Sequence, residues 1–156
     1  MKIVVIGIGQ SMRGDDAAGL EAVHRWQQDY RQSAGRPEVS VEASGLPGLN
    51  LLDLLTNVDA AILVDAIRSK APIGTIHRLE PSQISAFSET VHSAHGWGLA
   101  ETLALAEELK LPARHVKIRI IGIEAGPMEL GGGLSREVES VMPAICSAIE
   151  EILPSL

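Results

Sequence analysis

Two adjacent carboxylates, Asp15 and Asp16, are the first residues of the chain whose types could support chemistry. They follow an apolar run over residues 2–8 that ends in glycines, and apolar residues at helical spacing come after them, a pattern that predicts strand, tight turn and helix. In open α/β sheets ligands bind beyond the carboxyl ends of the strands, where this turn would lie. The helix dipole favours ionised carboxylates there. An aspartate at a helix start is most often only a cap, but two aspartates are one more than a cap requires.

A third carboxylate, Asp65, follows the apolar run Ala-Ala-Ile-Leu-Val over residues 60–64. Such a continuous run is typical of a strand buried on both faces. A crossover helix usually returns the chain beside its first strand, so this strand is expected to neighbour residues 2–8. Asp65 would then lie close to Asp15 and Asp16.

Histidines decide which chemistry these carboxylates could perform. Of the five in the chain, only His92 and His95 fall in a loop that precedes a predicted helix, from which a side chain could reach the crevice. A lone histidine is usually a surface or structural residue, so the hypothesis depends on the combination. Two carboxylates and one imidazole leave coordination positions open, which suits a first-row divalent metal that also accepts water or a substrate group.

The glycines of Gly7-Ile8-Gly9 also allow a different interpretation, a dinucleotide-binding turn. That fingerprint needs a third glycine where this chain has Met12, and two aspartates at the helix start would repel a pyrophosphate. A nucleotide-binding module remains an alternative, in which Glu42 at the end of the second strand would accept a ribose hydroxyl.

The remaining pattern alternates strands and helices, which favours a three-layer α/β/α sandwich around a mostly parallel sheet of about five strands, with residues 1–156 as a single domain. Residues 81–91 are polar and have no clear assignment, and Ser135 is expected to cap the last helix. Strands are expected at residues 2–8, 38–43, 60–64, 74–80 at a sheet edge, and 116–123, and helices from about residue 20, at 49–55, at 99–109 and after Ser135.

The net charge of −7 argues against nucleic acid or an anionic membrane as a partner. The apolar runs are too short to span a bilayer, and the chain starts directly on a strand, so we expect a cytoplasmic protein. Cys146 falls in a helical pattern and is expected to be an ordinary buried thiol. A protein or a small molecule remains as the partner.

Five motifs together resemble the nickel-iron hydrogenase maturation endopeptidases. They are Ile-Gly-Ile-Gly-Gln-Ser-Met-Arg-Gly-Asp-Asp-Ala-Ala-Gly at residues 6–19, Val64-Asp65-Ala66, His95-Gly96-Trp97-Gly98-Leu99, Gly122-Ile123-Glu124 and Gly133-Leu134-Ser135. The resemblance spans nearly the whole chain. It implies an enzyme that removes a short C-terminal peptide from the hydrogenase large-subunit precursor after nickel insertion.

The resemblance also implies the site. In that family an acidic residue, an aspartate and a histidine bind the metal, and they correspond here to Asp16, Asp65 and His95, the implied metal-binding and catalytic residues. Gln10 stands where Asn is common, Asp16 stands where many members have Glu, and residues 42–45 match the usual Asp-Gly-Gly-Thr loop only loosely.

A mechanism without a covalent intermediate is expected, because the chain has no nucleophile elbow and no His-Glu-x-x-His helix. In our hypothesis, nickel carried by the precursor is bound by the three implied ligands and acts as a Lewis acid. Asp15 would be a helix cap or a support for the metal ligands. Gly7, Gly9, Gly45 and Gly48 would let the backbone pass close to the substrate tail.

Two alternatives to this hypothesis stay open. The same ligands could hold a resident zinc ion, and zinc or cadmium could substitute for nickel in a crystal. A nickel-sensing or chaperone protein without catalytic activity would share the ligands and leave the precursor intact. For the protease we expect a monomer that meets the precursor transiently.

Overall fold

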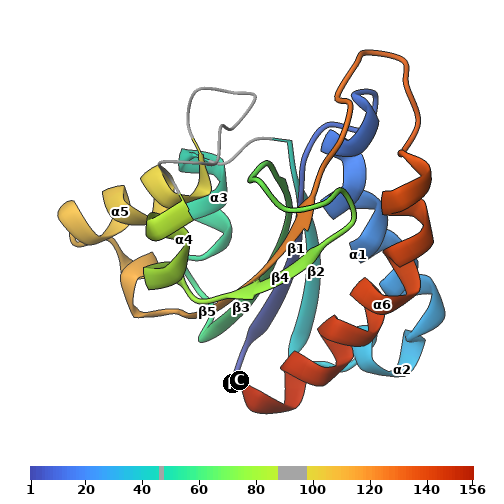
Figure 1. The fold of residues 1–156 in the computed structure, drawn as a ribbon. Helices are drawn as coiled ribbons and strands as arrows, with labels where there is room; N and C mark the ends of the chain where they lie inside the picture. The colour runs from blue at the N-terminus through green and yellow to red at the C-terminus, as the bar shows by residue number, and fades with distance from the viewer. Residues whose placement is uncertain (46–47, 88–97) are drawn as a thin grey trace.

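A computed structural model describes residues 1–45, 48–87 and 98–156, and its centre is a five-stranded sheet. The strand order is β2-β1-β3-β5-β4, and only the edge strand β4 runs antiparallel to its neighbour. The expected fold class and the pairing of the first and third strands are therefore confirmed (Figure 1). The strands are β1 (Ile3–Ile8), β2 (Val39–Ser44), β3 (Ala60–Ile67), β4 (Ile76–Leu79) and β5 (Lys117–Glu124).

Helices cover both faces of the sheet, which gives the expected three layers (Figure 1). One face packs against α1 (Ala18–Asp29), α2 (Arg31–Ala34) and α6 (Arg136–Ile152). The other packs against α3 (Leu49–Leu54), α4 (Pro81–Phe87) and α5 (Leu99–Glu108). Short 3-10 turns are η1 (Gly14–Ala17), η2 (Pro112–His115) and η3 (Leu153–Ser155).

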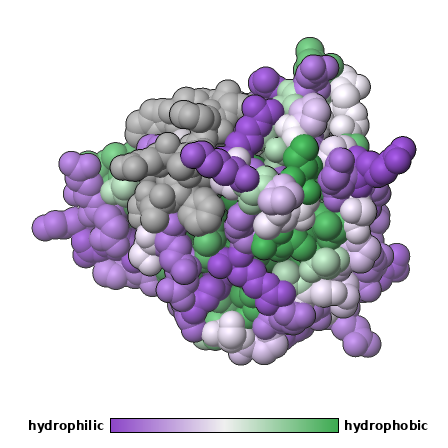
Figure 2. Space-filling view, viewed as in Figure 1, coloured by the Kyte–Doolittle hydropathy of each residue, from purple (hydrophilic) through white to green (hydrophobic). Residues whose placement is uncertain are grey.

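The core has two halves because neighbouring residues of a strand point to opposite faces. Val5 lies in the half formed with α1 and α6, whereas Ile6 lies in the half formed with α3 and α5. Burial on both faces explains the continuous apolar runs of β1 and β3. Figure 2 shows that apolar side chains also reach the surface, gathered over the region between β4 and α6 within mostly hydrophilic surroundings.

Two strands extend further than the sequence pattern predicts. β3 continues to Ile67, so Asp65 lies within the strand rather than after it, and β5 continues to Glu124. The reason is mutual pairing, because Asp65 lies opposite Gly122 and Ile67 lies opposite Glu124. A charged residue interrupts an apolar run in the sequence, but its main-chain N–H and C=O groups can still form hydrogen bonds with a neighbouring strand.

The segment without an assignment, residues 81–91, begins with α4. Cys146 is buried in α6, as expected. None of the helices in the described ranges combines the length and the apolar composition that a membrane span requires.

Candidate active site at the carboxyl ends of the strands

The turn after β1 is held against the sheet by close glycine contacts. A Cβ atom at Gly9 would collide with the main-chain carbonyl of Asp16, and one at Gly19 would collide with the carbonyl of Val64. Gly9 also has a φ of 143°, which side-chain-bearing residues rarely adopt. Because these positions lack side chains, η1 lies directly on the carboxyl ends of β1 and β3.

The same contacts correct part of the expectation for the glycines. A Cβ atom at Gly7 would lie 2.7 Å from the carbonyl oxygen of Gly19, so the start of α1 fills the space beside Gly7, and η1 fills the space beside Gly9. The expectation that these two make room for substrate is wrong. A Cβ atom added at Gly45 or Gly48 would meet no atom of the described residues within 4 Å apart from its chain neighbours, and room for a substrate there stays a prediction.

Asp16 and Asp65 are brought together at this end of the sheet. Asp16 lies in η1 with only 5% of its surface exposed, and Asp65 is partly buried in β3. Burial, followed by the nearby charge of Asp16, raises the pKa of Asp65 from 3.8 to about 8. Two neighbouring carboxylates in a desolvated place disfavour a second negative charge. At neutral pH the pair therefore retains a proton on Asp65.

Asp15 points elsewhere and binds main-chain groups. Its Oδ2 accepts a hydrogen bond from the N–H of Gly126 at 2.8 Å, and its Oδ1 accepts one from the N–H of Ser135 at 2.6 Å. It makes no capping bond to its own helix, since α1 begins without a side-chain cap. The cap interpretation of Asp15 is wrong. It supports the site by joining η1 to the loop before α6.

A further buried carboxylate, Glu124 at the end of β5, was not among the residues predicted to form the site. Its Oε2 accepts the Ser69 N–H at 2.6 Å, its Oε1 accepts the Ser69 hydroxyl, and the Nε2 of His77 lies 3.3 Å from Oε1. These bonds fix the connection from β3 to β4 against the end of β5. The motif Gly122-Ile123-Glu124 was the only sequence signal that pointed to this residue.

The implied third ligand, His95, lies outside the described residues, as does His92. Within the ranges 1–45, 48–87 and 98–156, no three His, Cys, Asp or Glu side chains gather in a way that could hold a metal ion. Asp16 and Asp65 are thus the two implied ligands that the structure places, and the role of His95 stays a prediction.

Comparison with known proteins identifies the family. The model of the hydrogenase maturation protease family matches residues 20–153. The chain belongs to this family of peptidases that act in hydrogenase maturation. The "Hydrogenase 2 maturation protease" of Escherichia coli K12 is 32% identical over 160 residues, which cover 100% of this chain and 91% of that protein.

A further relative and a solved structure agree with the family assignment of this chain. The "Hydrogenase expression/formation protein HupD" of Thiocapsa roseopersicina is 32% identical over 96% of this chain, and this chain spans 66% of its length. The solved structure of the hydrogenase maturating endopeptidase HybD from E. coli superposes with a TM-score of 0.80 at 24% identity, covering 99% of this chain and 94% of that one. That likeness confirms the fold.

In this maturation protease the thiol of Cys146 is badly placed to be a nucleophile. It packs between α6 and α1, with its Sγ 3.7 Å from the carbonyl oxygen of Ala22. Burial raises the pKa of the thiol above its usual range, so the reactive thiolate is disfavoured. The chemistry that the described site can supply is that of a carboxylate pair, which can bind a cation or exchange a proton.

Proposed function

We propose that this protease removes a C-terminal peptide from the nickel-loaded large-subunit precursor of a nickel-iron hydrogenase. In this proposal Asp16, Asp65 and His95 bind the nickel that the precursor carries. The nickel belongs to the substrate, so the enzyme acts only on a precursor whose metal has been inserted.

The observation that carries the proposal is the pairing of Asp16 with Asp65 at the carboxyl ends of neighbouring strands. Their mutual repulsion in a desolvated place is relieved either by a proton or by a divalent cation. Carboxylate oxygens and an imidazole are acceptable ligands for a first-row divalent metal. Without the cation, Asp65 keeps its proton. Nickel binding would replace this proton, so the charge state of the site would depend on whether nickel is present.

Catalysis would need no covalent intermediate. The nickel would position the scissile peptide and polarise its carbonyl or a water molecule. Water adds to that carbonyl, the C–N bond breaks, and the proton from water ends on the leaving amine. Asp15 contributes indirectly, because its bonds to Gly126 and Ser135 fix the turn on which Asp16 lies.

Incubation with the precursor tests this proposal. The purified protein is mixed with nickel-loaded and with nickel-free precursor, and the mass of each large subunit is measured. We expect loss of the C-terminal peptide from the nickel-loaded form alone. Cleavage of both forms would contradict the role of nickel in recognition. If neither form is cleaved, the proposed proteolytic function is contradicted.

Metal analysis separates substrate-borne nickel from a resident zinc ion. After dialysis the isolated protease should retain no stoichiometric metal. One tightly held zinc ion per chain would contradict the proposal. Sedimentation should give a monomer in the absence of the precursor.

A further inference from the structure

The strand β2 forms one edge of the sheet, and part of its main chain points away from the sheet. The carbonyl of Ser44 accepts the N–H of Gly9 at 3.0 Å, so the even-numbered residues of β2 turn toward β1. Main-chain groups alternate along a strand, and Val41 and Ala43 therefore direct their N–H and C=O groups outward. In the described part of the chain no strand lies beyond β2.

A groove of about 170 Å³ runs beside this outward edge. It lies between one side of α1, which includes Val23 and Gln27, and the strands β1 and β2, through Gly7, Val41, Glu42 and Ala43. Extended peptides bind sheet edges through main-chain hydrogen bonds, while pockets beside the edge receive alternate side chains. The groove is therefore placed where one side chain of an added strand would enter.

The edge also leads to the candidate active site. Ala43 lies opposite Gly7 near the end of β1, and the bond between Ser44 and Gly9 joins β2 to the turn that holds Asp16. A peptide that pairs with Val41 and Ala43 would run to the same end of the sheet as the carboxylate pair, and beyond β2 it would turn across the end of β1 to reach Asp16 and Asp65. Beyond β2, no atom of the described residues other than its chain neighbours lies within 4 Å of the place that a Cβ atom on Gly45 would occupy.

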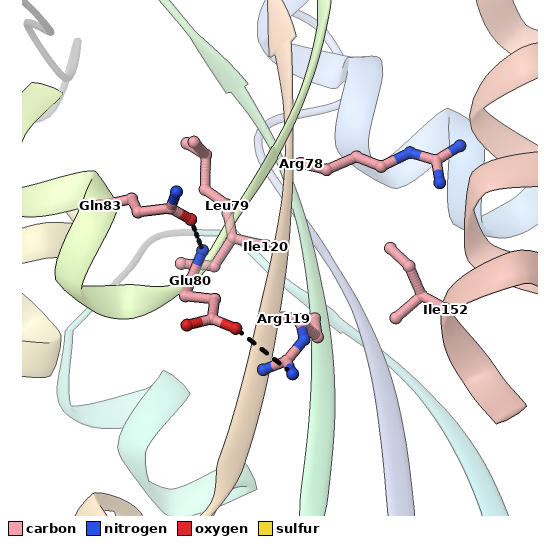
Figure 3. A pocket seen from close by; sticks show the side chains of 7 residues that line it. All are labelled: Arg78, Leu79, Glu80, Gln83, Arg119, Ile120 and Ile152. Carbon is pink, nitrogen blue, oxygen red and sulfur yellow. Dashed lines mark hydrogen bonds and ion pairs between the residues drawn. The ribbon is translucent and has the colours of Figure 1, made fainter. Parts of the chain in front are cut away.

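The opposite edge offers a poorer path for a peptide. A cavity of about 470 Å³ lies there, and its two cationic side chains are already engaged. Arg119 pairs with Glu80 at 3.3 Å, as Figure 3 shows, and Arg78 pairs with Glu151 at 2.7 Å. Arg119 stands near the start of β5, at the other end of the parallel sheet from Asp65.

We propose that the outward edge of β2 binds the extended C-terminal segment of the precursor as an additional strand. The groove between β2 and α1 receives one of its side chains. This inference rests on the proposed function and names how the substrate is held. Main-chain pairing aligns the tail with little regard for its sequence, and the groove adds selectivity.

A proline in place of Ala43 tests the main-chain contact. Ala43→Pro removes an outward N–H and leaves the bonds to β1 intact, which an edge strand tolerates. Arg78→Pro is the matched control. Glu124 donates to the Thr75 carbonyl across β4 and β5, so by alternation the N–H of Arg78 also points outward, at the other edge. Its exposed ion pair contributes little to stability.

A second pair of variants tests the groove without touching the strand. Gln27 is exposed on α1 and lines the groove, whereas the exposed neighbour Gln28 does not. Gln27→Trp should fill the groove, and Gln28→Trp adds the same side chain outside it. Circular dichroism shows whether each variant is folded. If Ala43→Pro does not fold, the result for Gln27→Trp alone decides whether the inference holds.

Kinetics with the nickel-loaded precursor give the readout. Ala43→Pro and Gln27→Trp should each raise KM about tenfold with little change in kcat, as expected when a binding contact is lost. Arg78→Pro and Gln28→Trp should match the wild type. A folded Ala43→Pro or Gln27→Trp variant with wild-type KM would overturn the inference. Absence of cleavage by the wild type would instead overturn the proposed function.

Discussion

The carboxylate of Asp15 accepts a 2.6 Å hydrogen bond from the main-chain N–H of Ser135 and so joins the first turn of the chain to the last helix. Ser135 in turn caps α6 by accepting the N–H of Val138 at 3.3 Å. The other oxygen of Asp15 accepts the N–H of Gly126. Asp16 is adjacent in sequence, so the two bonds of Asp15 that tether this turn to the start of α6 also hold the proposed metal ligand in place.

Replacing Asp15 by Ala should therefore destabilise the protein. Two partly buried N–H groups lose a charged acceptor, and the free energy of unfolding should fall by about 2 kcal/mol. Urea denaturation measures the change. Glu129→Ala, at an exposed position of the same loop, is the control and should be nearly neutral. Equal stability of the two variants would contradict the role given to Asp15.

Asp65 should make the metal-free protein less stable as pH rises. Its folded pKa is about 8 and its ordinary value is 3.8, so the folded state holds a proton that the unfolded state releases. The contribution is present in full below about pH 4 and is lost as pH rises through about 8. Asp65→Asn mimics the protonated form and should exceed the wild type in Tm at alkaline pH, measured with a chelator present. A wild type that is the more stable protein at alkaline pH would contradict the raised pKa.

The affinity for a divalent metal should increase over the same pH range in which the metal-free protein loses stability. A cation displaces the proton on Asp65, so affinity should increase as pH rises toward about 8 and then level off. Calorimetry with Ni²⁺ in buffers of different ionisation enthalpy counts the released proton. Asp65→Asn should bind more weakly and release no proton at this step. An affinity independent of pH would argue against Asp65 as a ligand.

His95→Ala should abolish processing of the nickel-loaded precursor without unfolding the protein. Loss of one of three ligands weakens the binding of nickel, and we expect a decrease in kcat/KM of at least about a hundredfold. His92→Ala is the matched control from the same segment and should matter much less. Mass spectrometry of the large subunit and circular dichroism of each variant provide the measurements. Equal activity of His95→Ala and the wild type would refute the ligand assignment.

Much of the architecture follows from local pattern. Apolar runs buried on both faces predicted β1 and β3, and helical spacing predicted α1, α5 and α6. Ser135 was recognised as a cap because the type of residue that begins a helix is a local property. The fold class, and with the family motifs the protease family, could therefore be predicted from the order of residues alone.

What each acidic residue does was decided by tertiary structure. The sequence presents Asp15 and Asp16 as equivalent neighbours, yet one binds the N–H groups of Gly126 and Ser135 while the charge of the other raises the pKa of Asp65. Glu124 gained its role only when β5 continued beside Ile67. The hydrogen-bond partners of Asp15 lie more than a hundred residues away in the sequence, and Ser69 lies 55 residues from Glu124. Patterns within a short window of sequence carry no information about them.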